Sequence, residues 1–142
     1  MTKKINVGEL EKEIKVEEIY RGDIYMVDFQ EGEGASTHRG KRPCIIVSNN
    51  VGNKYSSVVN VVLLTTNLKK KQLPTHLRLV PDHRNKLRQE STVMCEQMRT
   101  IGKECLKFKI GTLSREDTYR LDYVLGKTLG LTIAKKSNKF IT

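Results

Sequence analysis

The sequence predicts a mainly β domain that ends in one α-helix. About five short strand-like segments follow one another, and one helical pattern comes after them. The chain has 142 residues, of which 37% are hydrophobic, so it can bury one substantial core but not two. Short strands followed by an amphipathic helix favour a small, half-open β-barrel that the helix closes.

The first predicted strand is Ile24–Phe29, where Tyr25, Val27 and Phe29 share one face because side chains alternate along a strand. Residues 30–41 follow, with three glycines and no large apolar residue. Loops of this length are uncommon in compact domains unless they have a function, so this segment is predicted to be a functional loop.

The middle of the chain is predicted to hold the core of the sheet. Pro43–Ser48 is the second strand, with the proline tolerated as its first residue. Residues 49–57 are predicted to form a turn region. Val58–Thr65 is almost entirely β-branched or apolar, which predicts a central strand covered on both faces. A basic loop, Lys69–Leu73, comes next.

Two more strands are predicted at Thr75–Val80 and Ser91–Cys95, and the last element is a helix. Ser114 with Asp117 three positions later forms a capping-box pattern. Apolar residues then recur at helical spacing up to Leu129, and Gly130 suits a left-handed cap at the end of the helix.

The two ends of the chain are predicted to lie outside this domain, which spans residues 20–131. Residues 1–19 form a charged extension, with the pattern of a possible short helix, and residues 132–142 form a basic tail. The N-terminus has no apolar region typical of a signal peptide. The three cysteines include no CxxC pair, which indicates a reducing compartment. We therefore expect a cytoplasmic protein.

The charge of the chain indicates its partners. Lysine and arginine number 26 against 16 acidic residues, giving a net charge of +10. Such an excess raises the local concentration of polyanions. Nucleic acid is the first partner to consider and an acidic protein segment the second, while a basic protein with scattered charge is the plain alternative.

Two residues are placed to contact a phosphate. Pro43 pushes Arg42 towards an extended conformation, which would hold its guanidinium beside the glycine-containing loop, although Arg42 could also be an ordinary surface arginine. A guanidinium can donate two parallel hydrogen bonds to a phosphate. Thr65 ends the predicted central strand, where its hydroxyl could donate to a phosphate oxygen or serve only as a strand residue.

Further polar residues could contact RNA. Glu96 and Gln97 follow the strand that ends at Cys95, and a carboxylate beside an amide can read base edges in single-stranded RNA. The lysines of the basic loop, Lys69, Lys70 and Lys71, are expected to meet phosphates.

Several short motifs, taken in order, resemble one family. They are RGDIYMVDF, GKRPCIIVSNNVGNKYS, VVNVVLLTT, LPTHLRL, STVMCEQMRTI and a closing helix that ends in LGL. Their order and spacing resemble MazF/PemK toxins over about residues 20–131. The resemblance implies an SH3-like, half-open barrel of the MazF/PemK/CcdB type with a C-terminal helix.

The resemblance also implies roles for individual residues. Arg42 matches the catalytic arginine of the family, Thr65 the catalytic threonine, and Ser36 a serine of the family's G-S-E-Q loop. Leu73, Glu96 and Gln97 resemble positions that line the RNA groove. The loop departs from the family pattern at several positions, including His38. An imidazole suits proton transfer near neutral pH, and His38 is expected to be an auxiliary of the reaction at most and to contact RNA.

The implied activity is that of a toxin endoribonuclease, an mRNA interferase that cuts single-stranded RNA at a short sequence. The ribose 2′-OH attacks the adjacent phosphate and leaves a 2′,3′-cyclic phosphate and a 5′-hydroxyl, without a metal or other cofactor. The implied assembly is a homodimer, inhibited by an acidic antitoxin with which it forms a DNA-binding complex. Arginine stays protonated, so Arg42 suits charge stabilisation better than proton removal.

Two alternatives belong to other functional classes. A toxin that only binds nucleic acid, or poisons a protein target, could use the same barrel, since fold does not settle function. A metal-dependent nuclease could use Asp28, Glu31 and Glu33, but no histidine or further carboxylate stands at ligand spacing from them.

Overall fold

The computed structural model describes residues 18–29, 40–68 and 71–132. It contains one six-stranded sheet in the order β4-β5-β3-β2-β1-β6, with every neighbouring pair antiparallel. The strands are β1 (Asp23–Phe29), β2 (Gly40–Ile46), β3 (Val58–Thr65), β4 (His76–Leu79), β5 (Ser91–Gly102) and β6 (Leu106–Thr112). The helices are α2 (Asn50–Tyr55), the 3₁₀ turn η1 (Lys103–Cys105) and α3 (Arg115–Leu129).

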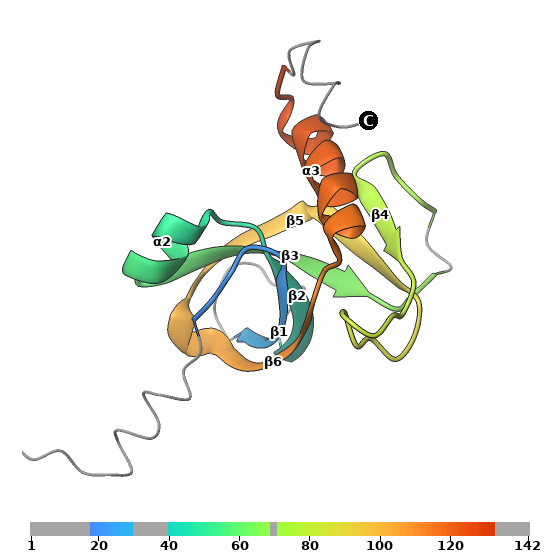
Figure 1. The fold of residues 1–142 in the computed structure, drawn as a ribbon. Coiled ribbons are helices and arrows are strands. Elements are labelled where there is room, and N and C mark those ends of the chain that lie inside the picture. The colour runs from blue at the N-terminus through green and yellow to red at the C-terminus, as the bar shows by residue number, and fades with distance from the viewer. Residues whose placement is uncertain (1–17, 30–39, 69–70, 133–142) are drawn as a thin grey trace, which may run out of the picture.

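The sheet curls strongly on itself, while α3 packs on its outer side near β4 and β5 (Figure 1). Among the described residues β4 and β6 remain unpaired edges, so the barrel is half-open, as predicted. The prediction of about five strands missed β6. Its apolar residues Leu106, Phe108 and Ile110 alternate with Lys107 and Lys109, which is the pattern of a strand, but the prediction gave the segment no element. Six of its seven residues are partly or fully exposed and only Gly111 is buried.

The two faces of the sheet bury separate cores. The barrel core, inside the curl, contains Tyr25, Val27, Phe29, Cys44, Ile46, Val59, Val61, Leu63, Met94 and Ile101. The helix-side core lies between the sheet and α3 and contains Ile24, Ile45, Val62, Leu64, Leu77, Leu79, Val93, Cys95, Leu113, Leu121, Val124 and Leu125. The strand β3 contributes to both cores, which confirms the prediction of a central strand covered on both faces.

Two predicted boundaries are wrong in an informative way. The strand β2 begins at Gly40, three residues before the predicted start at Pro43. It pairs with β3 only from Cys44 onward, so Pro43 lies where the strand has one partner and its missing N–H need not break a ladder. The strand β5 runs on to Gly102, far past the predicted end at Cys95.

The predicted turn region at residues 49–57 contains the helix α2. Asn49 caps it, because its side-chain oxygen accepts a hydrogen bond from the Gly52 N–H at 2.8 Å. The helix has six residues and exposes Val51 and Tyr55. Its lack of an apolar stripe explains why hydrophobic periodicity gave no helix there.

The C-terminal helix follows the prediction. The Ser114 hydroxyl accepts from the Asp117 N–H at 3.1 Å, and Gly130 adopts a left-handed φ of 69° after the last turn. Only half of the capping box is present among the described residues, since the Asp117 carboxylate binds Arg120 at 2.7 Å. The helix buries Leu121, Val124 and Leu125.

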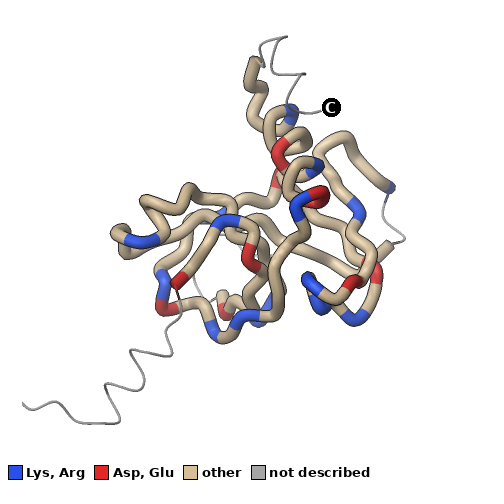
Figure 2. Tube along the Cα trace, viewed as in Figure 1, with Lys and Arg blue, Asp and Glu red and all other residues tan. Residues whose placement is uncertain are grey.

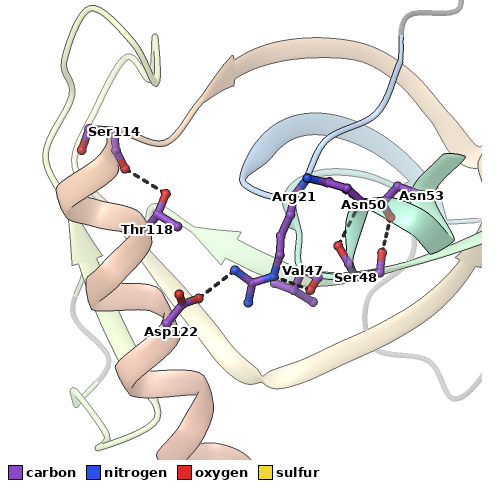
Figure 3. Close-up of polar contacts among 8 residues, drawn as sticks. All are labelled: Arg21, Val47, Ser48, Asn50, Asn53, Ser114, Thr118 and Asp122. Carbon is purple, nitrogen blue, oxygen red and sulfur yellow. Dashed lines mark hydrogen bonds and ion pairs between the residues drawn. The ribbon is translucent and has the colours of Figure 1, made fainter. Parts of the chain in front are cut away.

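Arg21 fastens the helix to the sheet (Figure 3). Its Nε donates to the Val47 carbonyl at 2.9 Å and its Nη1 lies 2.7 Å from the Asp122 carboxylate. Beside it, the fully buried Asn53 donates to the Ser48 carbonyl at 2.9 Å and to the Asn50 side chain at 3.2 Å. This arrangement of Arg21, Ser48, Asn50, Asn53 and Asp122 is called the Arg21 network below.

The predicted N-terminal extension and C-terminal tail lie almost entirely outside the described residues. Ile19, at the end of the extension, packs against the barrel core. Cys44 and Cys95 are free and buried, and burial raises the pKa of each thiol to about 12. No described helix is both long and apolar enough to cross a membrane.

Candidate active site

Arg42 lies within β2 on the side of the barrel core. Cys44 and Ile46 belong to that core, and alternation along the strand puts Arg42 on the same face. The residue is half-buried and pairs with Val27 of β1. The prediction placed Arg42 just before a strand. Instead, the ladder to β1 already fixes its backbone.

Thr65 lies across from Arg42 at the end of β3. Cys44 pairs with Leu63, so two further residues along each antiparallel strand bring Arg42 opposite Thr65. Both side chains are on the face of the barrel core, since Cys44 and Leu63 are. Pairing between the two strands stops at Cys44 and Leu63. The side chains of Arg42 and Thr65 therefore lie beyond the hydrogen-bonded part of the ladder.

The Thr65 hydroxyl is oriented by its own chain. Its oxygen accepts a hydrogen bond from the Asn67 N–H at 3.1 Å. A hydroxyl has one hydrogen and two lone pairs, so this bond leaves the hydrogen for donation. The geometry therefore suits a threonine that donates to a phosphate oxygen beside the Arg42 guanidinium.

The register extends this arrangement across the sheet. Thr65 pairs with Thr92 of β5, and Thr92 pairs with Arg78 of β4. Arg42, Thr65, Thr92 and Arg78 are called the polar row below. The Arg78 guanidinium donates to Glu90 at 3.3 Å and to Gln72 at 3.1 Å, while its buried Nε has no partner within the described ranges. The sequence analysis missed Arg78 and Thr92, because only the strand register places them in this row.

Glu96 and Gln97 lie in a bulge of β5. Val62 pairs with Met98, but the next residue of β3, Leu63, pairs with Met94, so residues 95–97 have no counterpart on β3. Such bulges bend a strand and redirect its side chains, often beside active sites. The prediction that this segment follows the strand is wrong, since it lies inside the strand.

The carboxylate of Glu96 is held by β4 and the turn before it. It accepts the Thr75 hydroxyl at 2.7 Å and lies 3.0 Å from His76 Nε2. The Leu73 N–H donates to His76 Nδ1 at 3.2 Å, so Nε2 carries the proton and donates to Glu96. Burial raises the pKa of Glu96, but the hydrogen bonds from Thr75 and His76 outweigh it and the net pKa is lowered.

A second cation faces the barrel core near Arg42. The Arg99 guanidinium stacks over the Phe29 ring, 4.9 Å from its centre. Burial raises the pKa of the Cys44 thiol, and the charges of Arg99 and Arg42 both act to lower it. Both guanidinium groups therefore lie within electrostatic reach of Cys44, on one side of the sheet. The sequence analysis quoted Arg99 within a motif but gave it no role.

Of the other predicted site residues, some lie within the described ranges and some lie outside them. Leu73 is exposed and bonded to His76, Lys71 is exposed, and Gln97 is half-buried in the bulge. The predictions for Ser36, His38, Lys69 and Lys70 fall outside the described residues. Within the described ranges no three histidine, cysteine or acidic side chains gather to hold a metal ion, while Glu31 and Glu33 of the metal alternative lie outside those ranges.

Comparison with known proteins finds relatives that belong to one toxin family. A family model described as "PemK-like, MazF-like toxin of type II toxin-antitoxin system" matches residues 20–129. The chain is 38% identical over 113 residues to the endoribonuclease MazF of Staphylococcus epidermidis, covering 80% of this chain and 92% of that protein.

Solved structures share the fold. An endoribonuclease from Mycobacterial species in complex with its cognate antitoxin is 27% identical, with a TM-score of 0.67 over 82% of this chain and 99% of that one. MazF from Deinococcus radiodurans is 18% identical, with a TM-score of 0.65 over 80% of this chain and 97% of that one, which concerns the fold alone. With the family model covering most of its length, this chain belongs to the family of PemK-like, MazF-like toxins of type II toxin–antitoxin systems.

Proposed function

We propose that this toxin is an endoribonuclease that cuts single-stranded RNA at a short sequence, without a metal, on the polar row. Membership of the family and the named activity of the Staphylococcus epidermidis relative support RNA cleavage. The observation that carries the proposed mechanism is the strand register that sets Thr65 opposite Arg42 on one face.

The reaction needs a nucleophile, and the substrate supplies it. The ribose 2′-oxygen attacks the adjacent phosphorus, the bond from phosphorus to the 5′-oxygen breaks, and a 2′,3′-cyclic phosphate and a 5′-hydroxyl form. The 2′-OH gives up one proton and the departing 5′-oxygen gains one. The phosphorane between these states is crowded with negative charge, so preorganised donors lower its energy most.

Two residues of the polar row, Arg42 and Thr65, then have roles that their chemistry allows. The Arg42 guanidinium stabilises the phosphorane and cannot accept a proton. The Thr65 hydroxyl donates to a phosphate oxygen. His76 does not serve as the base in this arrangement, because its Nδ1 accepts from Leu73 and its Nε2 donates to Glu96.

The bulge of β5 and the basic loop are proposed to bind the RNA around the cut. The Glu96 carboxylate is ionised and fixed by Thr75 and His76, so it can accept hydrogen bonds from a base. Gln97 follows Glu96 in the chain, and Leu73 lies in the turn before β4. Ser36, His38, Lys69, Lys70 and Lys71 are proposed to complete the RNA-binding surface.

The experiment is cleavage of a defined RNA in excess EDTA, with the product ends identified by mass spectrometry. We expect full activity and 2′,3′-cyclic phosphate ends, and no cleavage when the nucleotide before the cut carries 2′-deoxyribose. Loss of activity in EDTA would favour a metal-dependent nuclease. Absence of cleavage under every condition, with RNA still bound, would favour a toxin that only binds its target.

We also propose that a homodimer performs this reaction and that an acidic antitoxin covers the same site. One relative was solved with its cognate antitoxin, and the net charge of +10 suits an acidic partner. Antitoxin should displace an uncleavable RNA, and Arg42→Glu should weaken the binding of both. Simultaneous, independent binding of the two ligands would contradict overlap of their sites.

A further inference from the structure

A groove lies on the face of the sheet opposite to the polar row. It has a volume of about 510 Å³ and its floor includes Met26, Pro43 and Phe108. Met26 pairs with both Pro43 and Phe108, so these three side chains form one row across β2, β1 and β6. The loop between β4 and β5 forms one wall, with Lys86 and Arg88. We call this the loop groove.

The loop groove meets the candidate active site at one margin of the sheet. Pro43 is next to Arg42 and Thr66 is next to Thr65, and both Pro43 and Thr66 line the groove. Alternation puts them on the helix-side face, while Arg42 and Thr65 point to the barrel side. Between them β2 and β3 no longer pair, so the two sites lie on either side of the same open margin.

The groove is cationic and lacks acidic lining. Its lining contains Lys86, Arg88 and Lys109, with no carboxylate. The charge of Lys109 is neutralised by the buried Asp23, whose carboxylate lies 3.5 Å from the Lys109 Nζ. Among the described residues neither Lys86 nor Arg88 pairs with an acid, so these two positive charges remain for a ligand. Figure 2 shows the lysine and arginine positions along β6 and the loop.

The wall that carries these cations is rigid. Asn85 is fully buried; its side-chain oxygen accepts the N–H groups of Asp82 and Leu87 at 3.0 and 2.9 Å, and its amide donates to Val80. The loop also packs tightly on β6, where a Cβ at Gly111 would lie 2.4 Å from the Asn85 carbonyl oxygen. A fixed wall lowers the cost of ordering side chains when a ligand binds.

Lys86 occupies a backbone conformation that disfavours it. Its φ of 54° makes it the one non-glycine residue with positive φ among those described. Glycine and asparagine adopt this region with less strain than lysine. Strained positions of this kind occur at functional sites, and here the strain holds a lysine at the edge of the groove.

Phe108 provides the contact that distinguishes a nucleic acid from a simple anion. It is 57% exposed on the groove floor. Aromatic side chains beside cationic grooves stack with unpaired bases, because every base presents a π face. Two unpaired cations and an exposed ring, continuous with the catalytic margin, match the backbone and bases of one RNA strand.

We propose that the loop groove binds the nucleotides of the substrate RNA that lie beyond the cut on one side. Lys86 and Arg88 contact phosphates and Phe108 stacks with a base. This inference rests on the proposed endoribonuclease function and extends the substrate from the polar row round the margin of the sheet to its other face.

The test measures the cleavage of RNA substrates of different length by the wild type, by the double variant Lys86→Asn/Arg88→Gln and by Phe108→Leu. The substrates are a minimal cleavable RNA and versions extended on the 5′ or the 3′ side. We expect the double variant to raise KM on one extended substrate on the order of tenfold, with kcat and the minimal substrate unchanged. The slope of log affinity against log salt for an uncleavable extended RNA should fall by about 1.4 for two lost phosphate contacts.

The matched control is Lys54→Gln/Arg115→Gln, which removes the same charge from exposed positions outside the groove. It should leave both substrates unchanged. Lys86→Asn should not lower the melting temperature, since asparagine relieves the backbone strain, so a loss of RNA binding cannot be a loss of folding. Equal loss in the control, no loss on either extended RNA, or loss of antitoxin binding alone would overturn the proposal. Failure of the wild type to cleave any RNA would overturn the proposed function instead.

Discussion

The Arg21 network and the Arg42–Thr65 part of the polar row each place an arginine against the sheet, but they differ in how fully their polar groups are paired. Arg21 contacts Val47 and Asp122 with its side chain. Within the described ranges the Arg42 side chain makes no hydrogen bond or ion pair, and the Thr65 hydroxyl hydrogen is also available. Saturated polar groups stabilise a fold, whereas unsaturated ones at a fixed position can bind a ligand.

The comparison also assigns the family-like motif around Asn50 and Asn53 to structure. These side chains are bonded to Ser48, Arg21 and each other, and they join α2 to the sheet. The RP motif at Arg42, by contrast, leaves its arginine without a partner among the described residues. Motifs that look equally strong in the sequence therefore differ in how fully the structure pairs their side chains.

The largest expected effect is the loss of activity in Arg42→Ala. The rate of cleavage should fall on the order of a hundredfold or more, since a charge partner of the transition state is removed. The free energy of unfolding should change by less than about 0.5 kcal/mol, because the side chain makes no internal pair among the described residues. Thermal unfolding and single-turnover cleavage measure the two. Retention of more than a tenth of the rate would show that Arg42 is not catalytic.

Asn53→Ala should produce the reverse pattern. Asn53 is 1% exposed and bonded through its side chain, so its loss leaves the part-buried Ser48 carbonyl without this donor and should lower the free energy of unfolding by about 2 kcal/mol. The cleavage rate per folded molecule should stay within twofold. Chemical denaturation gives the first quantity and active-site titration the second. A stable variant that has lost activity would break the distinction between the two regions.

Substitutions of Thr65 by valine and by serine separate the effect of side-chain shape from the effect of hydrogen bonding. Valine keeps the β-branched shape and removes the hydroxyl, which should lower the rate roughly tenfold, as for a lost hydrogen bond of about 1.5 kcal/mol to a charged group. Serine keeps the hydroxyl and should retain much of the activity. The comparison uses kcat on one RNA for both variants. Equal rates would show that the hydroxyl does not act.

The strands and the C-terminal helix could be predicted where local patterns decide structure. The apolar run Val58–Thr65 and the caps at Ser114 and Gly130 have the predicted positions. The helix α2 could not, because it has no apolar periodicity and is stabilised by a cap at Asn49 and by the Arg21 network. The strand β6 was missed although Leu106, Phe108 and Ile110 alternate with lysines, which is a local strand signal.

The candidate site could be predicted only in part from local patterns. Arg42 and Thr65 stand at a spacing that a known family shares, but Arg78 and Arg99 approach the row only through register and a stacking contact. The long strand β5 was cut short at Cys95 because its apolar run ends there. Its bulge depends on how β3 pairs with two separate stretches of β5, which is a tertiary property.

The smallest expected effect concerns Glu96, whose carboxylate contacts Thr75 and His76 but keeps further lone pairs that can accept a hydrogen bond from a ligand. Its pKa is lowered from the ordinary value of 4.5. A carboxyl group with a lowered folded-state pKa stabilises the fold above its ordinary pKa, and this stabilisation is lost as the pH falls through the folded-state pKa. Because the side chain is 32% exposed, solvent screening should limit the contribution to less than about 0.5 kcal/mol.

Glu96→Gln should therefore be slightly less stable than the wild type near pH 6, and the difference should vanish as the pH falls below the ordinary value of 4.5. Thr75→Val removes a hydroxyl that donates to this carboxylate, so in its background the difference near neutral pH should be smaller. A double-mutant cycle at two pH values measures this coupling. RNA binding should respond more than stability does, because an ionised, fixed acceptor is lost from the proposed base-contact surface. A variant with reduced stability but unchanged RNA affinity would place Glu96 with the structural contacts of the fold.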